Sequence, residues 1–258
     1  MTTITAPVSE PLGGTRAVSQ LSVPVLIGLH LVPGVLVTAG FVAFAPLIEK
    51  LGFPPIAALL AAIALVLVPV ELGILARAAV REGVGFGGLI PFRRPIAARR
   101  WAWLVPTLIL VAFVGFGAHQ AIEPALIERF FGWLPTWFVT PIQIDLVRGY
   151  SATAWTVTLV AYFALNGFIG PVVEELYFRG FLLPRMVRFG RWAALINVSL
   201  FSLYHLWSPW QLVARIIGLG PTVYAVERTR NVYLGMVVHC TLNTIGMTLV
   251  AFMVLGRL

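Results

Sequence analysis

Two adjacent glutamates lie inside an apolar stretch of the chain, where ionised side chains are costly and need an explanation. Residues four apart share a face of an α-helix, so Glu175 and Arg179 can neutralise each other. Glu174 points about 100° away from its neighbour and must find other partners inside the fold. A carboxylate withdrawn from water can serve as a general base that activates a water molecule. The structural alternative, in which both glutamates brace Arg179, leaves one carboxylate unexplained.

Two histidines and an asparagine follow on later apolar stretches. Phe201 and His205 are four residues apart, and so are His239 and Asn243, so each pair projects from one face of a helix. A lone histidine on an apolar face is usually structural, but two histidines, an asparagine and the free Glu174 are less easily explained that way. Together they offer a base and donors for the oxyanion of peptide hydrolysis.

The same residue types also satisfy a catalytic zinc, with Glu174, His205 and His239 as ligands. The His-Glu-x-x-His spacing of the commonest zinc sites is absent from the sequence. Residue chemistry alone therefore leaves a metal-free site and a zinc site both open.

The remaining ionisable groups in apolar stretches have structural explanations. We expect His30 to be a hydrogen-bonded core residue and His119 to be solvated at a helix end. Glu71, six residues before Arg77, is expected to form an ion pair or to reach the cytoplasmic edge of the membrane. Arg215 is either a partner for a carboxylate or part of the lining of a polar path.

The composition requires a lipid environment for the elements that position these groups. Of the 258 residues, 59% are hydrophobic and 11% are charged, whereas a soluble domain has about 25% charged residues. The net charge of +8 comes from short arginine clusters between apolar runs, which fits cytoplasmic loops and anionic headgroups and excludes a nucleic-acid partner. One cysteine, Cys240, permits no intrachain disulfide.

We expect an all-α fold, a polytopic transmembrane bundle of about seven spans with the site inside it. The apolar runs cover residues 21–48, 54–79, 101–119, 152–183, 192–207, 210–226 and 232–255. The fifth and sixth runs are short, and the turn at Ser208 and Pro209 predicts that they form a helical hairpin.

The runs divide the chain into four parts. These are a disordered cytoplasmic tail (1–20), N-terminal transmembrane helices (21–120), an extracytoplasmic interfacial segment (121–150) and a catalytic transmembrane core (151–258). Arginine clusters follow the second, fourth and sixth runs, so we expect a multi-pass protein of the cell (inner) membrane with a cytoplasmic N-terminus. With about 1.5 Å of rise per residue, Glu174, His205, His239 and Asn243 lie about 12–21 Å deep, in one layer.

Three motifs in this order resemble the CAAX prenyl endopeptidase and bacteriocin-processing (CPBP, or Abi) family of intramembrane proteases. That family shows Glu-Glu-x-x-x-Arg, then Phe-x-x-x-His, then His-x-x-x-Asn. Here the motifs stand at 174–179, 201–205 and 239–243, and the resemblance covers about residues 171–245. The first three apolar runs carry no signature of the family.

The resemblance implies a role for each motif residue. Glu174 and His205 would activate water, and His239 and Asn243 would stabilise the oxyanion. The remaining motif residues would support the site, namely Glu175, Arg179 and Phe201. The resemblance also implies a mechanism without a cofactor, with one zinc as the alternative.

We therefore expect an intramembrane endopeptidase whose partners are the bilayer and a membrane protein or peptide substrate. The Arg-rich, Lys-poor composition is typical of a GC-rich prokaryote, so removal of a bacteriocin leader or cleavage of another membrane peptide is favoured over a prenylated substrate. Two other classes compete with this interpretation. One is a non-catalytic scaffold or immunity protein of the same fold, and the other is a proton-coupled transporter that uses Glu174 and the histidines.

Overall fold

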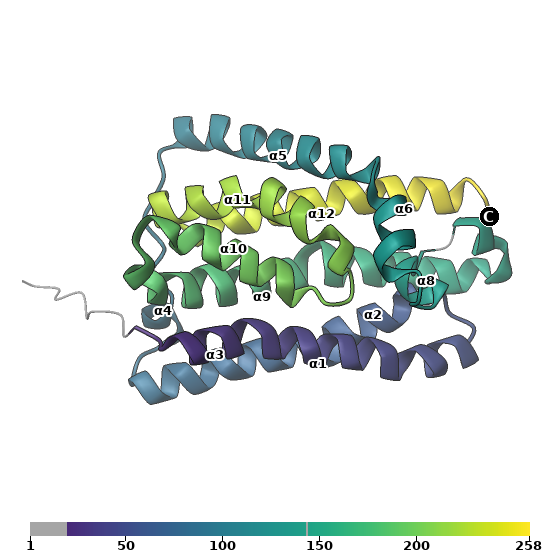
Figure 1. Ribbon diagram of the computed structural model, residues 1–258, viewed down its shortest axis with the longest axis horizontal. Coiled ribbons are helices and arrows are strands. Elements are labelled where there is room, and N and C mark those ends of the chain that lie inside the picture. The colour runs from purple at the N-terminus through teal and green to yellow at the C-terminus, as the bar shows by residue number, and fades with distance from the viewer. Residues whose placement is uncertain (1–19, 143) are drawn as a thin grey trace, which may run out of the picture.

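A computed structural model describes residues 20–142 and 144–258, so the predicted tail lies outside the described residues except for Gln20. Over these ranges the chain forms helices and no strand, and one isolated bridge joins Arg93 to Asn231. The long helices run side by side along the longest axis of the molecule (Figure 1). The predicted all-α bundle is confirmed.

The first half of the chain contributes three long helical rods. They are α1 (Val23–Lys50), the continuous α2 (Ile56–Ala62), η1 (Ile63–Leu67) and α3 (Val68–Glu82), and α5 (Ala98–Gln120), with the short α4 (Phe86–Leu89) between the last two. η1 is a wide π-helical turn next to Pro69. Gly83, with φ of 61°, adopts the left-handed conformation that ends α3.

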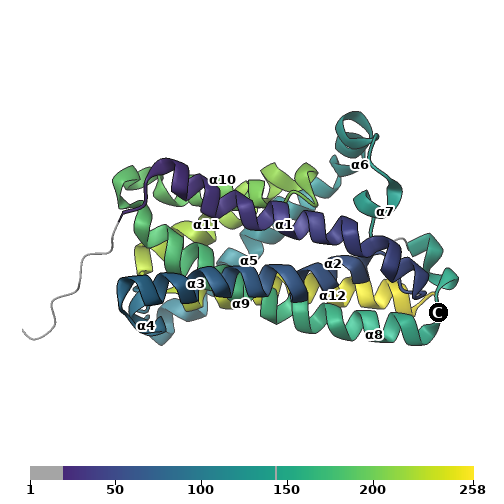
Figure 2. The same ribbon diagram turned by 90° about the horizontal axis from the view of Figure 1, so that it is seen from below.

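Residues 121–150 form short helices at one end of the bundle (Figure 2). They are α6 (Glu123–Leu126), η2 (Ile127–Phe131), α7 (Thr136–Val139) and η3 (Ile144–Gly149). Phe130, on η2, and Trp133, in the turn after it, are largely exposed, as aromatic side chains at a membrane interface would be.

The second half begins with one helical stretch that folds back on itself. It comprises α8 (Ala152–Tyr162), η4 (Phe163–Ile169), α9 (Gly170–Glu174), η5 (Glu175–Leu182), η6 (Leu183–Trp192) and α10 (Ala193–Tyr204). The reversal is at Gly190, whose φ of 53° suits a residue without a Cβ. The helix therefore continues beyond position 183, where the fourth apolar run was expected to end.

Three further helices complete the bundle, and they are η7 (Pro209–Gln211), α11 (Leu212–Thr229) and α12 (Val232–Leu255). Over the described ranges, five helical stretches are long and apolar enough to cross a membrane. Residues 152–204 count as one of them although they reverse at Gly190, and α11 is not among them. A polytopic membrane bundle is thus confirmed, with five stretches rather than seven meeting this requirement.

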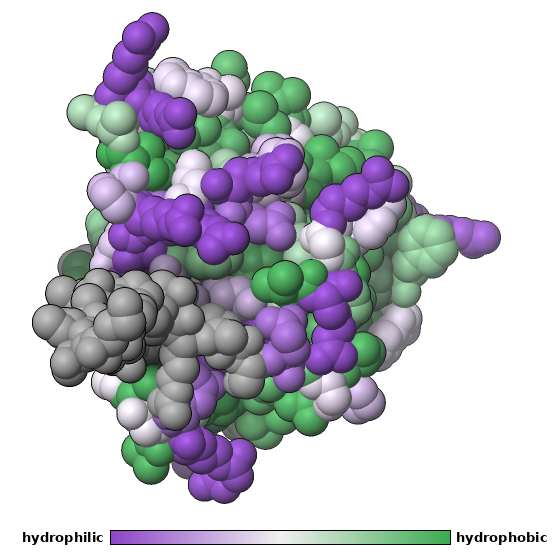
Figure 3. Space-filling model, turned by 90° about the vertical axis from the view of Figure 1, so that its left-hand side faces the viewer, coloured by the Kyte–Doolittle hydropathy of each residue, from purple (hydrophilic) through white to green (hydrophobic). Residues whose placement is uncertain are grey.

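The arginine clusters gather at one end of the bundle. Helices α3 and α11 end there, and α5 and α10 begin there (Figure 1). Figure 3 views this end, where hydrophilic residues form extended patches. Many large apolar side chains are exposed elsewhere on the molecule, such as Leu65, Val160 and Phe252, as lipid-facing helices require.

Candidate active site

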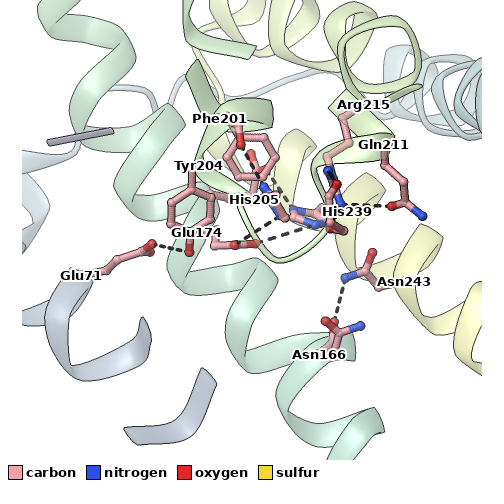
Figure 4. Close-up of polar contacts among 12 residues, drawn as sticks. Glu71, Asn166, Glu174, Phe201, Tyr204, His205, Gln211, Arg215, His239 and Asn243 are labelled. Carbon is pink, nitrogen blue, oxygen red and sulfur yellow. Dashed lines mark hydrogen bonds and ion pairs between the residues drawn. The ribbon is translucent and has the colours of Figure 1, made fainter. Parts of the chain in front are cut away.

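The motif side chains meet on the wall of a cavity inside the bundle. The cavity has a volume of about 610 Å³, and Glu174, His205, His239 and Asn243 all line it. They come from three rods, because Glu174 ends α9, His205 follows α10, and His239 and Asn243 lie on α12 (Figure 4). The structure therefore brings together the four residues that the sequence selected for catalysis.

Glu174 lies between the two histidines. Its Oε1 is 3.9 Å from Nε2 of His205, and its Oε2 is 3.9 Å from Nε2 of His239. Only 5% of Glu174 is exposed. These distances are too long for hydrogen bonds. Contacts between catalytic groups are often this long in a free enzyme and shorten when the reacting water and the substrate are bound.

The backbone fixes the tautomer of His205. Its Nδ1 lies 2.8 Å from the carbonyl oxygen of Phe201. A carbonyl only accepts hydrogen bonds, so Nδ1 carries the proton and, in the neutral ring, Nε2 keeps a lone pair. This lone pair faces an oxygen of Glu174, which is also an acceptor. Two acceptors that face each other suit a donor with two protons, such as a water molecule.

His239 is tied to the buried ion pair of the first motif. Its Nδ1 lies 3.2 Å from Oε1 of Glu175, and the same oxygen lies 3.3 Å from a guanidinium nitrogen of Arg179. Glu175 and Arg179 are 3% and 1% exposed. The guanidinium also lies 3.8 Å from the centre of the Phe201 ring, whose edge contacts His205. Glu175, Arg179 and Phe201 thus form one layer behind both histidines.

Gly235, which was not among the residues predicted from the sequence, makes room for this layer. A Cβ at this position would lie 3.0 Å from Cδ of Glu175 and closer still to Oε2. Gly235 precedes His239 by four residues on α12, so it faces the same side of the helix. A glycine one turn before a motif histidine is the sequence signal that could have identified it.

Asn243 has a partner that the sequence did not predict. Its side-chain nitrogen donates to the backbone carbonyl of Asn166 at 2.8 Å. Asn166 lies in the π-helical turn η4, where its carbonyl would accept from the residue five positions later. That residue is Pro171, which has no N–H. Asn243 fills this position, and its second amide hydrogen is available for another acceptor.

Two of the structural expectations for other polar residues are wrong. Glu71 is fully buried, forms no ion pair with Arg77 and does not reach the edge of the bundle; its Oε1 instead accepts a hydrogen bond from Tyr204. His119 is also buried rather than solvated, and its Nε2 lies 3.5 Å from Oε2 of Glu123.

Two further expectations agree with the structure. His30 is a core residue whose ring nitrogens lie 2.8 Å from the carbonyl oxygen of Leu26 and 3.2 Å from Nδ2 of Asn197. Arg215 lines the cavity and donates to neutral groups of Ser208 and Gln211. Of the two roles considered for Arg215, the structure thus favours the lining of a polar path.

The donor atoms around Glu174 bear on the zinc alternative. Among the residues that the structure describes, no group of three or more His, Cys, Asp or Glu side chains is arranged to hold a metal ion. Two ligand atoms on one tetrahedral zinc would be about 3.4 Å apart, whereas each histidine nitrogen is 3.9 Å from the Glu174 oxygen that it faces. The carboxylate behind His239 is nevertheless a common feature of zinc sites.

Comparison with known proteins gives one family match. Residues 155–245 match the model of the type II CAAX prenyl endopeptidase Rce1-like family. No curated protein and no solved structure gives a significant match. The matched region includes all three motifs and the four cavity-lining motif residues, and it confirms the resemblance of this part of the chain to the CAAX prenyl endopeptidases, a family of membrane proteases.

Proposed function

We propose that the protein is an intramembrane endopeptidase that hydrolyses a peptide bond of a membrane-associated protein or peptide. The observation that carries this proposal is the position of Glu174, a carboxylate that lies between two histidines from two other helical segments on the wall of a cavity. A cavity of about 610 Å³ is large enough for several residues of a peptide.

In this proposal Glu174 and His205 orient and deprotonate the attacking water. The water donates one hydrogen to a Glu174 oxygen and the other to the lone pair on Nε2 of His205. Glu174 takes the proton as the water oxygen attacks the peptide carbonyl. Glu174 then returns that proton to the leaving amine, so the carboxylate is restored at the end of the cycle.

His239 and Asn243 supply the donors for the oxyanion. In this proposal Nδ1 of His239 donates to Glu175 and Nε2 donates to the oxyanion. Both nitrogens can donate only when the ring is an imidazolium, and the Glu175 carboxylate stabilises that charge. Asn243 contributes its second amide hydrogen, since the first is bound by Asn166. Such donors are effective because a site shielded by the membrane has a low dielectric constant. No metal takes part in the proposed mechanism.

The test compares cells that carry the wild-type protein with cells that carry Glu174→Gln at equal expression. Membrane proteomics should find at least one shortened product in wild-type cells only. A peptide spanning that cleavage point should then be cleaved by the purified wild-type protein in liposomes and not by Glu174→Gln. A protein that cleaves nothing in either experiment would instead be a non-catalytic scaffold.

We further propose that the arginine-rich end of the bundle and the N-terminus are cytoplasmic, in the cell membrane, because cationic loops are retained on that side. The exposed Trp133 near the opposite end provides the test. In a background with Cys240→Ser, a cysteine at position 133 should react with an impermeant maleimide in intact cells. If the cysteine reacts only after the cells are opened, the orientation is the reverse of the one proposed.

A further inference from the structure

The backbone leaves the helical conformation at His205, so the segment that follows this residue needs another support. His205 comes directly after α10 and has a ψ of 57°, outside the helical range. It begins the α10–α11 connection, residues 205–211. Within this connection Trp207 packs against the His205 ring with centroids 4.7 Å apart, and the N–H of Ser208 donates to the carbonyl oxygen of His205 at 3.0 Å. The position of the connection therefore affects the imidazole that the proposed mechanism uses.

Arg215 holds the α10–α11 connection from the next helix, α11 (Figure 4). It is only 7% exposed. One terminal nitrogen donates to the carbonyl oxygen of Ser208 at 3.0 Å, and the other donates to the hydroxyl of the same residue. The second nitrogen also donates to Oε1 of Gln211 at 3.0 Å. A guanidinium can make these bonds together because its five N–H donors have a fixed, planar arrangement.

Glu123 holds the same connection from α6. Its Oε1 accepts from Nε1 of Trp210 at 3.1 Å, and both of its oxygens lie 3.3 Å from Nε2 of Gln211. The Gln211 carboxamide thus lies between a cation and an anion, with its oxygen bonded to Arg215 and its nitrogen to Glu123. Among residues 20–142 and 144–258, no carboxylate lies within ion-pair distance of Arg215. Its hydrogen bonds in these ranges all go to the α10–α11 connection.

We propose that Arg215 is a positioning residue that clamps the α10–α11 connection and thereby holds the His205 ring in place beside Glu174. This inference rests on the proposed function. Burying a cation without a carboxylate partner is costly, so its presence needs a reason. A neutral side chain could replace one of the bonds to Ser208 but not the pair. Arg215 therefore acts through the geometry of its donors and not through its charge.

Substitutions at both ends of the clamp test this role in catalysis. Arg215→Met removes the donors at similar side-chain length and should lower kcat about 10- to 100-fold by misplacing His205. Arg215→Lys keeps the charge without the planar fork and should lose nearly as much. Ser208→Ala removes one bond and should cost about 3- to 10-fold, but nothing more in the Arg215→Met background, where that bond is already lost. The assay is cleavage in liposomes of the peptide identified by proteomics.

The surroundings of His205 can also be measured without a substrate. The chain has four histidines, so NMR of protein with isotope-labelled histidine resolves their ring signals, and single substitutions assign them. Arg215→Met and Ser208→Ala should shift the His205 signal and leave that of the core residue His30 unchanged. The matched control is Ser202→Ala, because the Ser202 hydroxyl donates within its own helix at 2.7 Å. This variant should keep the wild-type kcat and His205 signal.

The outcomes distinguish this inference from the proposed function. An unchanged His205 signal in Arg215→Met and Ser208→Ala, or a wild-type kcat in Arg215→Lys, would overturn the clamp while an inactive Glu174→Gln left the protease assignment intact. A higher KM in Arg215→Met with kcat and the His205 signal unchanged would also overturn it, and would assign Arg215 to substrate binding. A shifted His205 signal supports the clamp even if Glu174→Gln is fully active, a result that would overturn only the proposed function.

Discussion

The adjacent glutamates should respond in opposite ways to the same substitution. Glu175 shares one oxygen between Arg179 at 3.3 Å and His239 at 3.2 Å, and both members of the ion pair are buried. Glu175→Gln would keep an acceptor for His239 but leave the Arg179 charge without its carboxylate. Breaking a buried pair in this way costs about 3–5 kcal/mol.

The expected change in melting temperature follows from this free energy. For a chain of this size, each kcal/mol shifts the melting temperature by about 2–4 °C, so Glu175→Gln should melt about 6–20 °C below wild type. Arg179→Met should lose a similar amount, because it strands the carboxylate. The double variant should recover at least half of the loss, since it removes both charges and keeps much of the buried volume.

Glu174→Gln should behave differently, because no arginine of the described part of the chain lies within ion-pair distance of Glu174. The amide removes the base and a buried charge together, so activity should vanish while the melting temperature stays within about 3 °C of wild type. Thermal melts followed by tryptophan fluorescence in detergent and activity assays on the same preparations give both values. A stable, inactive Glu175→Gln beside a Glu174→Gln that melts far below wild type would refute the assignment of the two roles.

Three further predictions follow from the site. Asn243→Ala should leave residual activity, about 10²- to 10³-fold below wild type, as loss of one oxyanion donor does, and steady-state kinetics with Glu174→Ala as the inactive reference will measure it. Purified active protein should contain no stoichiometric zinc by elemental analysis and should keep its activity after chelation; one tightly bound zinc whose removal and return switch activity would contradict the metal-free mechanism. Gly235→Ala should lower both melting temperature and activity, because its Cβ would meet the Glu175 carboxylate. Its control on the same helix, Gly246→Ala, meets no atom within 4 Å and should melt at or above the wild-type temperature.

The meeting of the motif residues could be predicted from the sequence. Glu174 and the residues of the later motifs lie at similar depths on rods that alternate in direction, and spacing alone gives those depths. The four-residue intervals also placed Glu175 beside Arg179, as the structure shows. Depth and local helical phase are properties of one short segment at a time, which is why sequence patterns report them well.

The contacts of Glu71 and Asn243 could not be predicted in this way. Each depends on a π-helical turn, η1 before Glu71 and η4 at Asn166. A wide turn adds one residue and rotates every later side chain by about 100° relative to a straight α-helix. Phase counted from the sequence is therefore wrong beyond the turn, so the face of the helix on which Glu71 lies could not be derived from the sequence.

Three carboxylates that lie close together have three different surroundings. Glu175 is paired with Arg179, Glu71 is hydrogen-bonded to Tyr204, and of these three only Glu174 lines the cavity. A buried carboxylate is costly in a membrane unless it is neutralised, hydrogen-bonded or used. The first two cases apply to Glu175 and Glu71. Glu174 remains the one carboxylate of the three that can reach a bound peptide, which is why the proposed chemistry belongs to it.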